Sequence, residues 1–143
     1  MKEIILIKDG ELALKGLNRS SFESMLMKNI KRRIHQFGAF QLKNSQSTIT
    51  VTPIDENADL DAAADEISRV FGISAYSRAA VSEKDIDKIL EIAPEYLKDQ
   101  LYEAKTFKVE AKRSDKSFPY NSPEISAMVG GKLLECFPHL KVD

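Results

Sequence analysis

The order of strand-like and helix-like segments over the first 81 residues constrains the fold more than any other feature of the sequence. Residues 3–8 form an apolar, β-branched run, which is typical of a buried central strand. The segments that follow are a long helical pattern, two short strands around a polar turn, a second helical pattern and a last strand, at 20–37, 41–43, 48–52, 59–71 and 73–81. The order β-α-β-β-α-β predicts an α+β, ferredoxin-like domain over residues 1–80, with both helices on one face of an antiparallel sheet.

Both helical patterns carry local start and stop signals. Ser20 and Glu23 have the spacing of a capping box, and Gly38 is a typical helix stop. The second helix is expected to open at Asn57 or Asp59 and to stop at Gly72. The residues expected to face the core are Phe22, Leu26, Ile30 and Ile34 in the first helix and Leu60, Ala63, Ala64, Ile67, Val70 and Phe71 in the second.

Residues 81–143 predict a second, α/β domain. Its expected elements are a helix that Ser82 or Asp85 opens and that Pro94 should kink or split, a half-buried strand over 106–112, a helix capped by Ser122, and the start of a strand at 140–143. One strand and the start of another are too little for a stable sheet. We therefore expect this domain to be truncated at its carboxyl end, or to be completed by another molecule, for example in a homodimer.

Composition excludes several classes of protein. The single cysteine rules out an internal disulfide framework, and with only two distant histidines no zinc cluster is expected. No apolar run approaches the roughly 18 residues that span a bilayer, and the amino terminus lacks a secretory cleavage site. Cys136 is expected to be a buried, inert thiol, and the sequence contains no catalytic or metal-binding motif. A reducing, cytoplasmic location with no membrane partner fits best.

Charge is strongly segregated along the chain. Residues 1–50 carry nine Lys/Arg against four Asp/Glu, residues 51–104 carry five against thirteen, and residues 105–143 carry seven against five. A basic, acidic, basic layout indicates a polyanion that contacts the two ends of the chain and avoids the middle. The alternative is ordinary scatter of charge over a solvated surface.

Three basic segments are candidates for binding such a polyanion. The connection between the first strand and the first helix takes about ten residues, longer than the usual 2–6, and contains Lys15 and Arg19. The first helix then carries a stripe opposite its apolar face, formed by Lys28, Lys31, Arg32 and His35. A loop without a ligand and a solvated helix face are the respective alternatives.

The third segment, 112–122, has the composition most typical of nucleic-acid binding. Lys112, Arg113 and Lys116 lie beside two aromatic residues, just before a helix amino terminus that favours an anion. Arg113 is expected to bind a phosphate through two parallel hydrogen bonds, and Phe118 or Tyr120 is expected to stack on a base. In the alternative, both aromatic rings pack in the hydrophobic core, and the basic side chains are solvated without a ligand.

Two stretches resemble a known family, the tRNA 4-thiouridine synthases. The stretch from Gly10 to Arg19, followed by Phe22-Glu23, resembles the amino-terminal signature of that family. The stretch from Phe107 to Phe118, with Ser122 and Gly130 beyond, resembles the strand, loop and helix of the THUMP domain, which certain methyltransferases and deaminases share. Residues 81–143 then correspond to a THUMP domain. The family often has a basic residue and an aromatic before the first glycine, where this chain has Lys8-Asp9.

The resemblance implies a function for the parent protein and a role for this part of it. A tRNA sulfurtransferase of this family adenylates uridine 8 of tRNA in an ATP-pyrophosphatase domain, absent here, and replaces oxygen with sulfur from a persulfide supplied by a cysteine desulfurase. Some members also supply sulfur for the thiazole of thiamine, and some carry a rhodanese domain. This chain then holds the tRNA acceptor region and binds no cofactor itself. The matching positions are Lys15, Asn18, Arg19, Lys112, Arg113, Lys116 and Phe118.

Two other interpretations remain open at this stage. One is the amino-terminal RNA-binding part of a different THUMP protein, a methyltransferase or an adaptor. The other is a structural or dimerisation domain without any RNA ligand.

Overall fold

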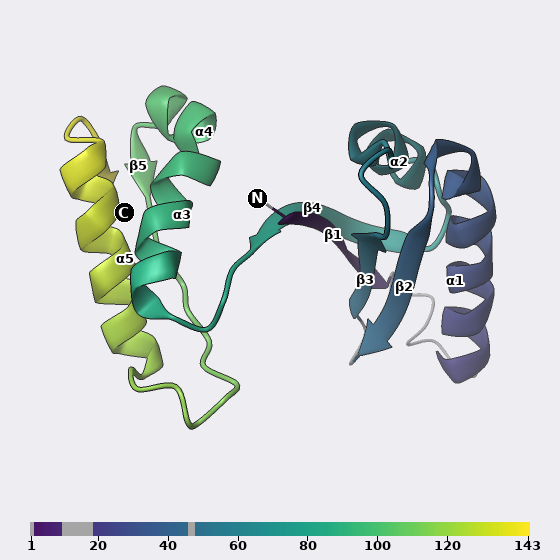
Figure 1. The fold of residues 1–143 in the computed structure, drawn as a ribbon, viewed down its shortest axis with the longest axis horizontal. Coiled ribbons are helices and arrows are strands. Elements are labelled where there is room, and N and C mark those ends of the chain that lie inside the picture. Colours follow the sequence, from purple (N-terminus) through teal and green to yellow (C-terminus); the bar gives the residue numbers. More distant parts are fainter. Residues whose placement is uncertain (1, 10–18, 46–47) are drawn as a thin grey trace. The chain divides into compact units, whose positions relative to one another are not determined.

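The chain forms two compact units, residues Met1–Val81 and Ser82–Asp143 (Figure 1). The structure is a computed structural model, and it describes residues 2–9, 19–45 and 48–143. The division falls one residue beyond the expected boundary at residue 80. The units are called unit 1 and unit 2 below, and each is described by itself.

Unit 1 has a four-stranded antiparallel sheet with strand order β2-β3-β1-β4. The predicted element order is confirmed, and the apolar run at 3–8 lies in the central strand, as expected. The elements are β1 (Lys2–Asp9), α1 (Arg19–Ile34), the 3-10 helix η2 (His35–Phe37), β2 (Phe40–Ser45), β3 (Thr48–Pro53), α2 (Leu60–Ile67) and β4 (Ile73–Val81).

The core of unit 1 lies between one face of the sheet and the two helices. Ile5 lies opposite Val51 and Ile7 opposite Ile49, so these four side chains share a face, and all are fully buried. Apolar side chains of α1 and α2 pack against that face. These side chains are Phe22, Leu26, Ile30, Ile34, Ala63, Ala64 and Ile67. The four-residue period in α1 therefore buries the residues that the sequence indicated, whereas the run in β1 is fully buried only at Ile5 and Ile7, and Ile4 and Leu6 are half-buried.

Two local predictions for unit 1, at Ser20 and Phe71, are wrong, and the choice between Asn57 and Asp59 as a helix cap is decided. Ser20 lies inside α1 rather than capping it, and the nearly buried Glu23 accepts a hydrogen bond from the Asn44 side chain on β2. Asp59, not Asn57, caps α2, since its carboxylate accepts a hydrogen bond of 3.0 Å from the Ala62 N–H. Phe71 was expected in the core and is 81% exposed, because α2 ends at Ile67 and the helical period no longer applies.

Unit 2 is built around two long helices that pack side by side (Figure 1). Its elements are α3 (Ile86–Tyr96), α4 (Lys98–Glu103), β5 (Thr106–Phe107), α5 (Ser122–Cys136) and β6 (Lys141–Val142). β5 and β6 pair in parallel, which confirms the start of a strand predicted at 140–143. The helix that contains Pro94 separates into α3 and α4 at Leu97, as the proline led us to expect. The buried core residues are Leu101, Val129, Leu133, Phe137 and Leu140.

Unit 2 also corrects three predictions. The strand expected over 106–112 pairs only at Thr106–Phe107, because β6 offers two partner residues, although exposure still alternates to residue 113. Asn121 rather than Ser122 caps α5 and forms a capping box with Glu124. Cys136 is exposed, whereas the next residue, Phe137, occupies the buried position at the end of the helix.

The described residues offer neither a membrane span nor a metal cluster. None of the helices in ranges 19–45 and 48–143 is long and apolar enough to cross a bilayer. Within the same described part of the chain, no group of three or more His, Cys, Asp and Glu side chains could hold a metal ion.

Candidate nucleic-acid interface

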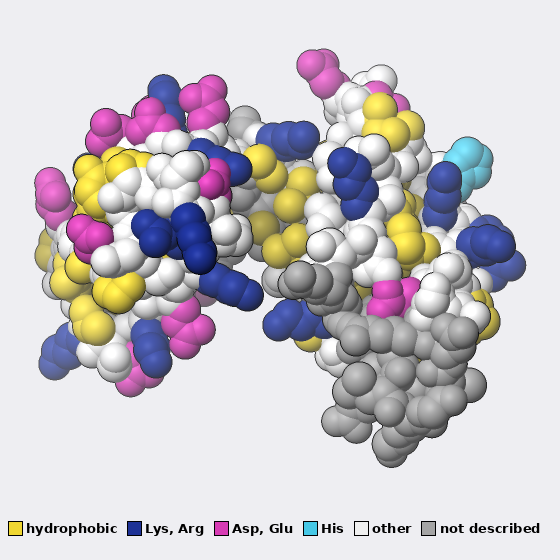
Figure 2. Space-filling view, turned by 90° about the horizontal axis from the view of Figure 1, so that it is seen from below, with side chains coloured by type: hydrophobic (Ala, Val, Ile, Leu, Met, Phe, Trp, Pro, Cys, Tyr) yellow, Lys and Arg dark blue, Asp and Glu magenta, His cyan; other side chains and the backbone are white. Residues whose placement is uncertain are grey.

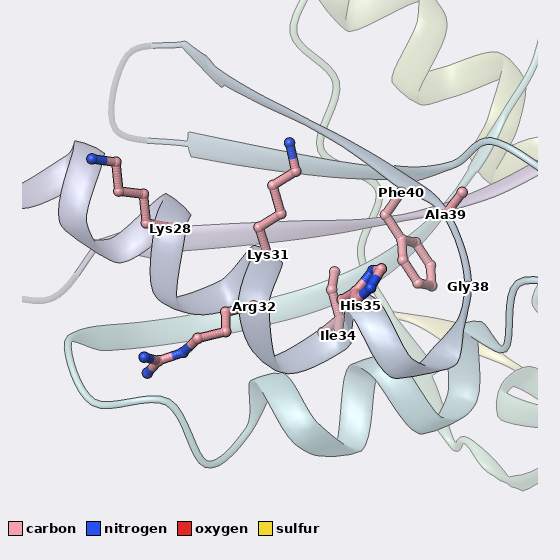
Figure 3. A pocket seen from close by; sticks show the side chains of 8 residues that line it. All are labelled: Lys28, Lys31, Arg32, Ile34, His35, Gly38, Ala39 and Phe40. Carbon is pink, nitrogen blue, oxygen red and sulfur yellow. The ribbon is translucent and has the colours of Figure 1, made fainter.

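One side of α1 presents the predicted basic stripe to solvent. Lys28, Lys31, Arg32 and His35 are all exposed, because they lie opposite the buried face of the helix. They line an open hollow of about 500 Å³ together with the turn at Gly38–Phe40 (Figure 3). Figure 3 shows Lys31 and Arg32 extending to different sides of the helix. Figure 2 shows lysine and arginine side chains beside a histidine on unit 1.

The cations of this stripe differ from their neighbour Arg33 in how they are paired. Arg33 forms an ion pair of 3.0 Å with Glu66 and donates a hydrogen bond to the Arg69 carbonyl, so it ties α1 to α2. Lys28, Lys31 and Arg32 form no ion pair with any of the carboxylates whose side chains the structure describes, in residues 2–8, 20–45 and 48–143. Their charge is therefore available to an anion without breaking an internal contact.

The basic loop of unit 2, residues 112–121, is folded around Asp115. The Asp115 carboxylate accepts hydrogen bonds from the Ser117 hydroxyl at 2.6 Å and the Ser117 N–H at 3.0 Å, and it forms an ion pair of 3.1 Å with Lys84. The Ser117 hydroxyl, then the Ser117 N–H, then Lys84 lower the pKa of Asp115 to about 2. The loop is thus locally ordered by a charged group that stays ionised near neutral pH.

Arg113 holds the two ends of the same loop together. Its guanidinium Nη1 donates to the Phe118 carbonyl at 3.1 Å and lies 3.5 Å from the Tyr120 carbonyl. Its backbone N–H donates to the Ser122 hydroxyl at 3.0 Å. Arg113 is half-buried by these contacts. The guanidinium that was predicted to bind a phosphate therefore already forms contacts that stabilise the loop.

The remaining predicted residues of the loop fall into two groups. Lys112 and Lys116 are exposed and available to an anion. Phe118 is half-buried, and its ring contacts Tyr120 edge-on, with centroids 6.2 Å apart. Phe118 also lines a hollow of about 360 Å³ within unit 2, which it shares with Ile89, Ile125 and the Arg113 side chain. A packing role for Phe118 is therefore at least as well supported as base stacking.

The amino terminus of α5 is less open to an anion than its sequence indicated. The Asn121 side chain accepts a hydrogen bond of 2.9 Å from the Glu124 N–H, and the Glu124 carboxylate accepts one of 3.1 Å from the Asn121 N–H. Pro123 has no N–H to offer. The capping box thus satisfies the main donors and places a negative charge in the first turn.

The structure brings the predicted site residues into two groups, one in each unit. Lys28, Lys31 and Arg32 lie on the solvent-exposed part of α1, and Lys112, Arg113, Lys116 and Phe118 share one loop. Lys15 and Asn18 lie outside the described residues, as does the side chain of Arg19 at the start of α1. The Lys84–Asp115 pair was not predicted, because no local sequence pattern signals an ion pair between residues 31 positions apart.

Two family models match the chain one after the other. Residues 4–77 match the ThiI ferredoxin-like domain, and residues 83–143 match the THUMP domain. A probable tRNA sulfurtransferase of Acetivibrio thermocellus is 46% identical over 145 residues, and one of Thermoanaerobacter pseudethanolicus is 43% identical over 143 residues. Each alignment covers 100% of this chain, which spans only 37% and 36% of those relatives.

Solved structures show the same similarity. A 4-thiouridine synthetase in a complex with RNA and bound ATP matches with a TM-score of 0.79 and 30% identity, over 100% of this chain and 36% of that one. A protein from Pyrococcus horikoshii matches with a TM-score of 0.76 and 30% identity, over 99% of this chain and 47% of that one. The family resemblance indicated by the sequence is confirmed.

Proposed function

The chain belongs to the family defined by the ThiI ferredoxin-like domain, here followed by a THUMP domain, and we propose that it is the tRNA-binding portion of a tRNA sulfurtransferase. The observation that carries this proposal is the row of unpaired cations on α1. Lys28 and Arg32 are one helical turn, about 6 Å, apart along the helix axis. Such a row suits successive contacts with a phosphate backbone, and Lys112 and Lys116 add exposed charge in unit 2.

The match over residues 4–77 distinguishes this function from that of other THUMP proteins. A methyltransferase or an adaptor is expected to share the THUMP domain, but the first domain matches the ThiI model specifically. The curated relatives described above are named probable tRNA sulfurtransferases. The sulfurtransferase is therefore the better supported parent.

We extend the proposal to the chemistry of that parent. It uses ATP, bound in a pyrophosphatase domain that is not part of this chain, to make 4-thiouridine at position 8 of tRNA. A cysteine desulfurase supplies the sulfur as a persulfide, and the same sulfur feeds thiamine thiazole synthesis in some members of the family. The protein acts in the cytoplasm, a reducing compartment in which Cys136 of this chain stays reduced. The 143-residue chain binds tRNA and does not catalyse thiolation.

The experiment that tests this function is the salt dependence of tRNA binding. In the triple variant Lys28→Glu/Lys31→Glu/Arg32→Glu, affinity should fall and the slope of log K against log salt should decrease by about 0.7–0.9 per lost phosphate contact. The control is Lys98→Glu, a single reversal at an exposed lysine of the acidic helix α4, which should leave the slope unchanged, whereas the single variant Lys31→Glu should lower it. Equal effects of these two single reversals, or no tRNA binding by the wild-type chain, would contradict the proposal.

A further inference from the structure

Phe71 is the most exposed large apolar side chain among the described residues, at 81%. It lies in the turn between α2 and β4, directly before Gly72. Gly72 has φ of +98°, which residues with a side chain rarely adopt, and an added Cβ would lie 3.0 Å from the Phe22 ring. The turn therefore packs closely against the core at Gly72, and the Phe71 ring beside it is exposed to solvent.

The ring borders an open hollow of about 480 Å³ between this turn and α1. Three residues of α1 line the hollow with chemistry that suits a nucleotide: the exposed thioether of Met25, the amide of Asn29 and the guanidinium of Arg32. The same Arg32 also lines the hollow of the basic stripe, so the two surfaces are continuous. Among the residues that the structure describes, no aspartate or glutamate lines the hollow.

We propose that Phe71 is a stacking platform for an unpaired base of the bound RNA. The base lies on the Phe71 ring with Met25 at its border, Asn29 offers an amide to the base edge, and Arg32 binds the adjoining phosphate. This inference rests on the proposed tRNA binding and adds a recognition element that basic side chains do not provide. An aromatic face beside an unpaired cation favours a nucleotide over an apolar protein surface, which would leave the Arg32 charge buried without a partner.

Fluorescence provides a direct test, because the chain contains no tryptophan. In the variant Phe71→Trp, the free protein should emit as a solvent-exposed indole. A ten-nucleotide single-stranded RNA should quench this emission, and the same RNA with abasic sugars should not, since its phosphates remain but its bases are gone. The control is Tyr102→Trp, at a 60% exposed aromatic on the acidic helix α4, where no quenching is expected.

A binding measurement separates the platform from the basic stripe. Phe71→Ala should weaken binding of a tRNA with unpaired nucleotides by at least about fivefold, the lower end for a base stacked on an aromatic ring. Phe71→Tyr should retain binding, and neither variant should change the melting temperature appreciably, because the side chain is exposed. The salt slope should remain that of the wild type in both, since no phosphate contact is removed.

The outcomes distinguish this inference from the function on which it rests. If wild-type protein binds tRNA but Phe71→Ala binds equally well and the introduced indole is not quenched, the platform is wrong and the tRNA-binding function stands. Blue-shifted emission of Phe71→Trp without RNA would place protein over the ring and would also overturn the platform. If the wild-type chain does not bind tRNA at all, the proposed function fails and the platform fails with it.

Discussion

Replacing Arg113 separates a residue that shapes the RNA-binding loop from the residues that touch RNA. The Arg113 guanidinium donates one well-formed hydrogen bond of 3.1 Å, to the Phe118 carbonyl, and a second contact, to the Tyr120 carbonyl, at the 3.5 Å limit. A hydrogen bond from a charged group contributes about 1.5–3 kcal/mol. Counting the first bond in full and the second as minor, we expect Arg113→Ala to lower the free energy of unfolding by about 2 kcal/mol.

Thermal unfolding without RNA is the first assay. For a unit of this size, a loss of about 2 kcal/mol lowers the melting temperature by about 10 °C. Arg113→Lys should recover part of the loss, because an ammonium group keeps the charge and can donate to one of the two carbonyls. The matched controls are Lys112→Ala and Lys116→Ala, exposed lysines of the same loop, which should change stability by no more than about 0.5 kcal/mol.

Binding of tRNA by the same four variants is the second assay. Each lysine variant should flatten the salt slope by one contact, about 0.7–0.9, while Arg113→Ala should weaken binding mainly by loosening the loop and leave the slope nearer to the wild-type value. The reasoning is refuted if Arg113→Ala melts like the wild type and lowers the salt slope by a full contact. Arg113 would then bind a phosphate directly, as the sequence predicted.

Three further predictions concern single residues. Gly38→Ala should destabilise unit 1 by at least about 2 kcal/mol in denaturant unfolding, because Gly38 has φ of +133° and an added Cβ would lie 2.6 Å from the Ala58 Cα; unchanged stability would mean that the turn is not held as described. Phe118→Ala should cost about 2 kcal/mol of unfolding free energy, given that the ring is half-buried against Tyr120, and a loss confined to tRNA affinity would instead establish base stacking. Asp115 has a pKa lowered to about 2, so its ionised form stabilises the fold above about pH 4, and this contribution is lost as the pH falls through 2. The difference in melting temperature between wild type and Asp115→Asn should therefore shrink between pH 4 and pH 2, and a constant difference would contradict this assignment.

The sequence predicts unit 1 well because its periodic patterns and its packing agree. The run at 3–8 is fully buried at Ile5 and Ile7 because these side chains face the two helices, whereas its unbroken apolar composition indicates burial on both faces and Ile4 and Leu6 are only half-buried. Phe71 shows where the pattern misleads, since the helical period was extended past the residue at which α2 ends. Phe71 lies in the turn directly before Gly72, and the positive φ of that glycine is a backbone feature that a hydrophobic period does not encode.

The candidate site is less predictable, because composition does not distinguish a free cation from an engaged one. Residues 112–122 were identified correctly as a basic, aromatic segment before a helix. The role of Arg113 in bracing the loop depends on backbone carbonyls five and seven residues away, and the capping box at Asn121 depends on a shift of one residue from Ser122. Such contacts depend on the path of the loop, which a strand or helix period does not fix.

Nine basic side chains therefore fall into two classes with different consequences for binding. Arg33, Arg69 and Arg78 are paired with carboxylates, and Arg113 with carbonyls, so they stabilise each unit. In the described part of the chain, Lys28, Lys31, Arg32, Lys112 and Lys116 have no such carboxylate partners. A phosphate binds most favourably to a cation that has no internal partner to give up. Substitutions in the second class should therefore change the affinity for tRNA, and substitutions in the first class should change the stability of the fold. A charge-reversal series that mixed the two classes would confuse a loss of folding with a loss of RNA contact.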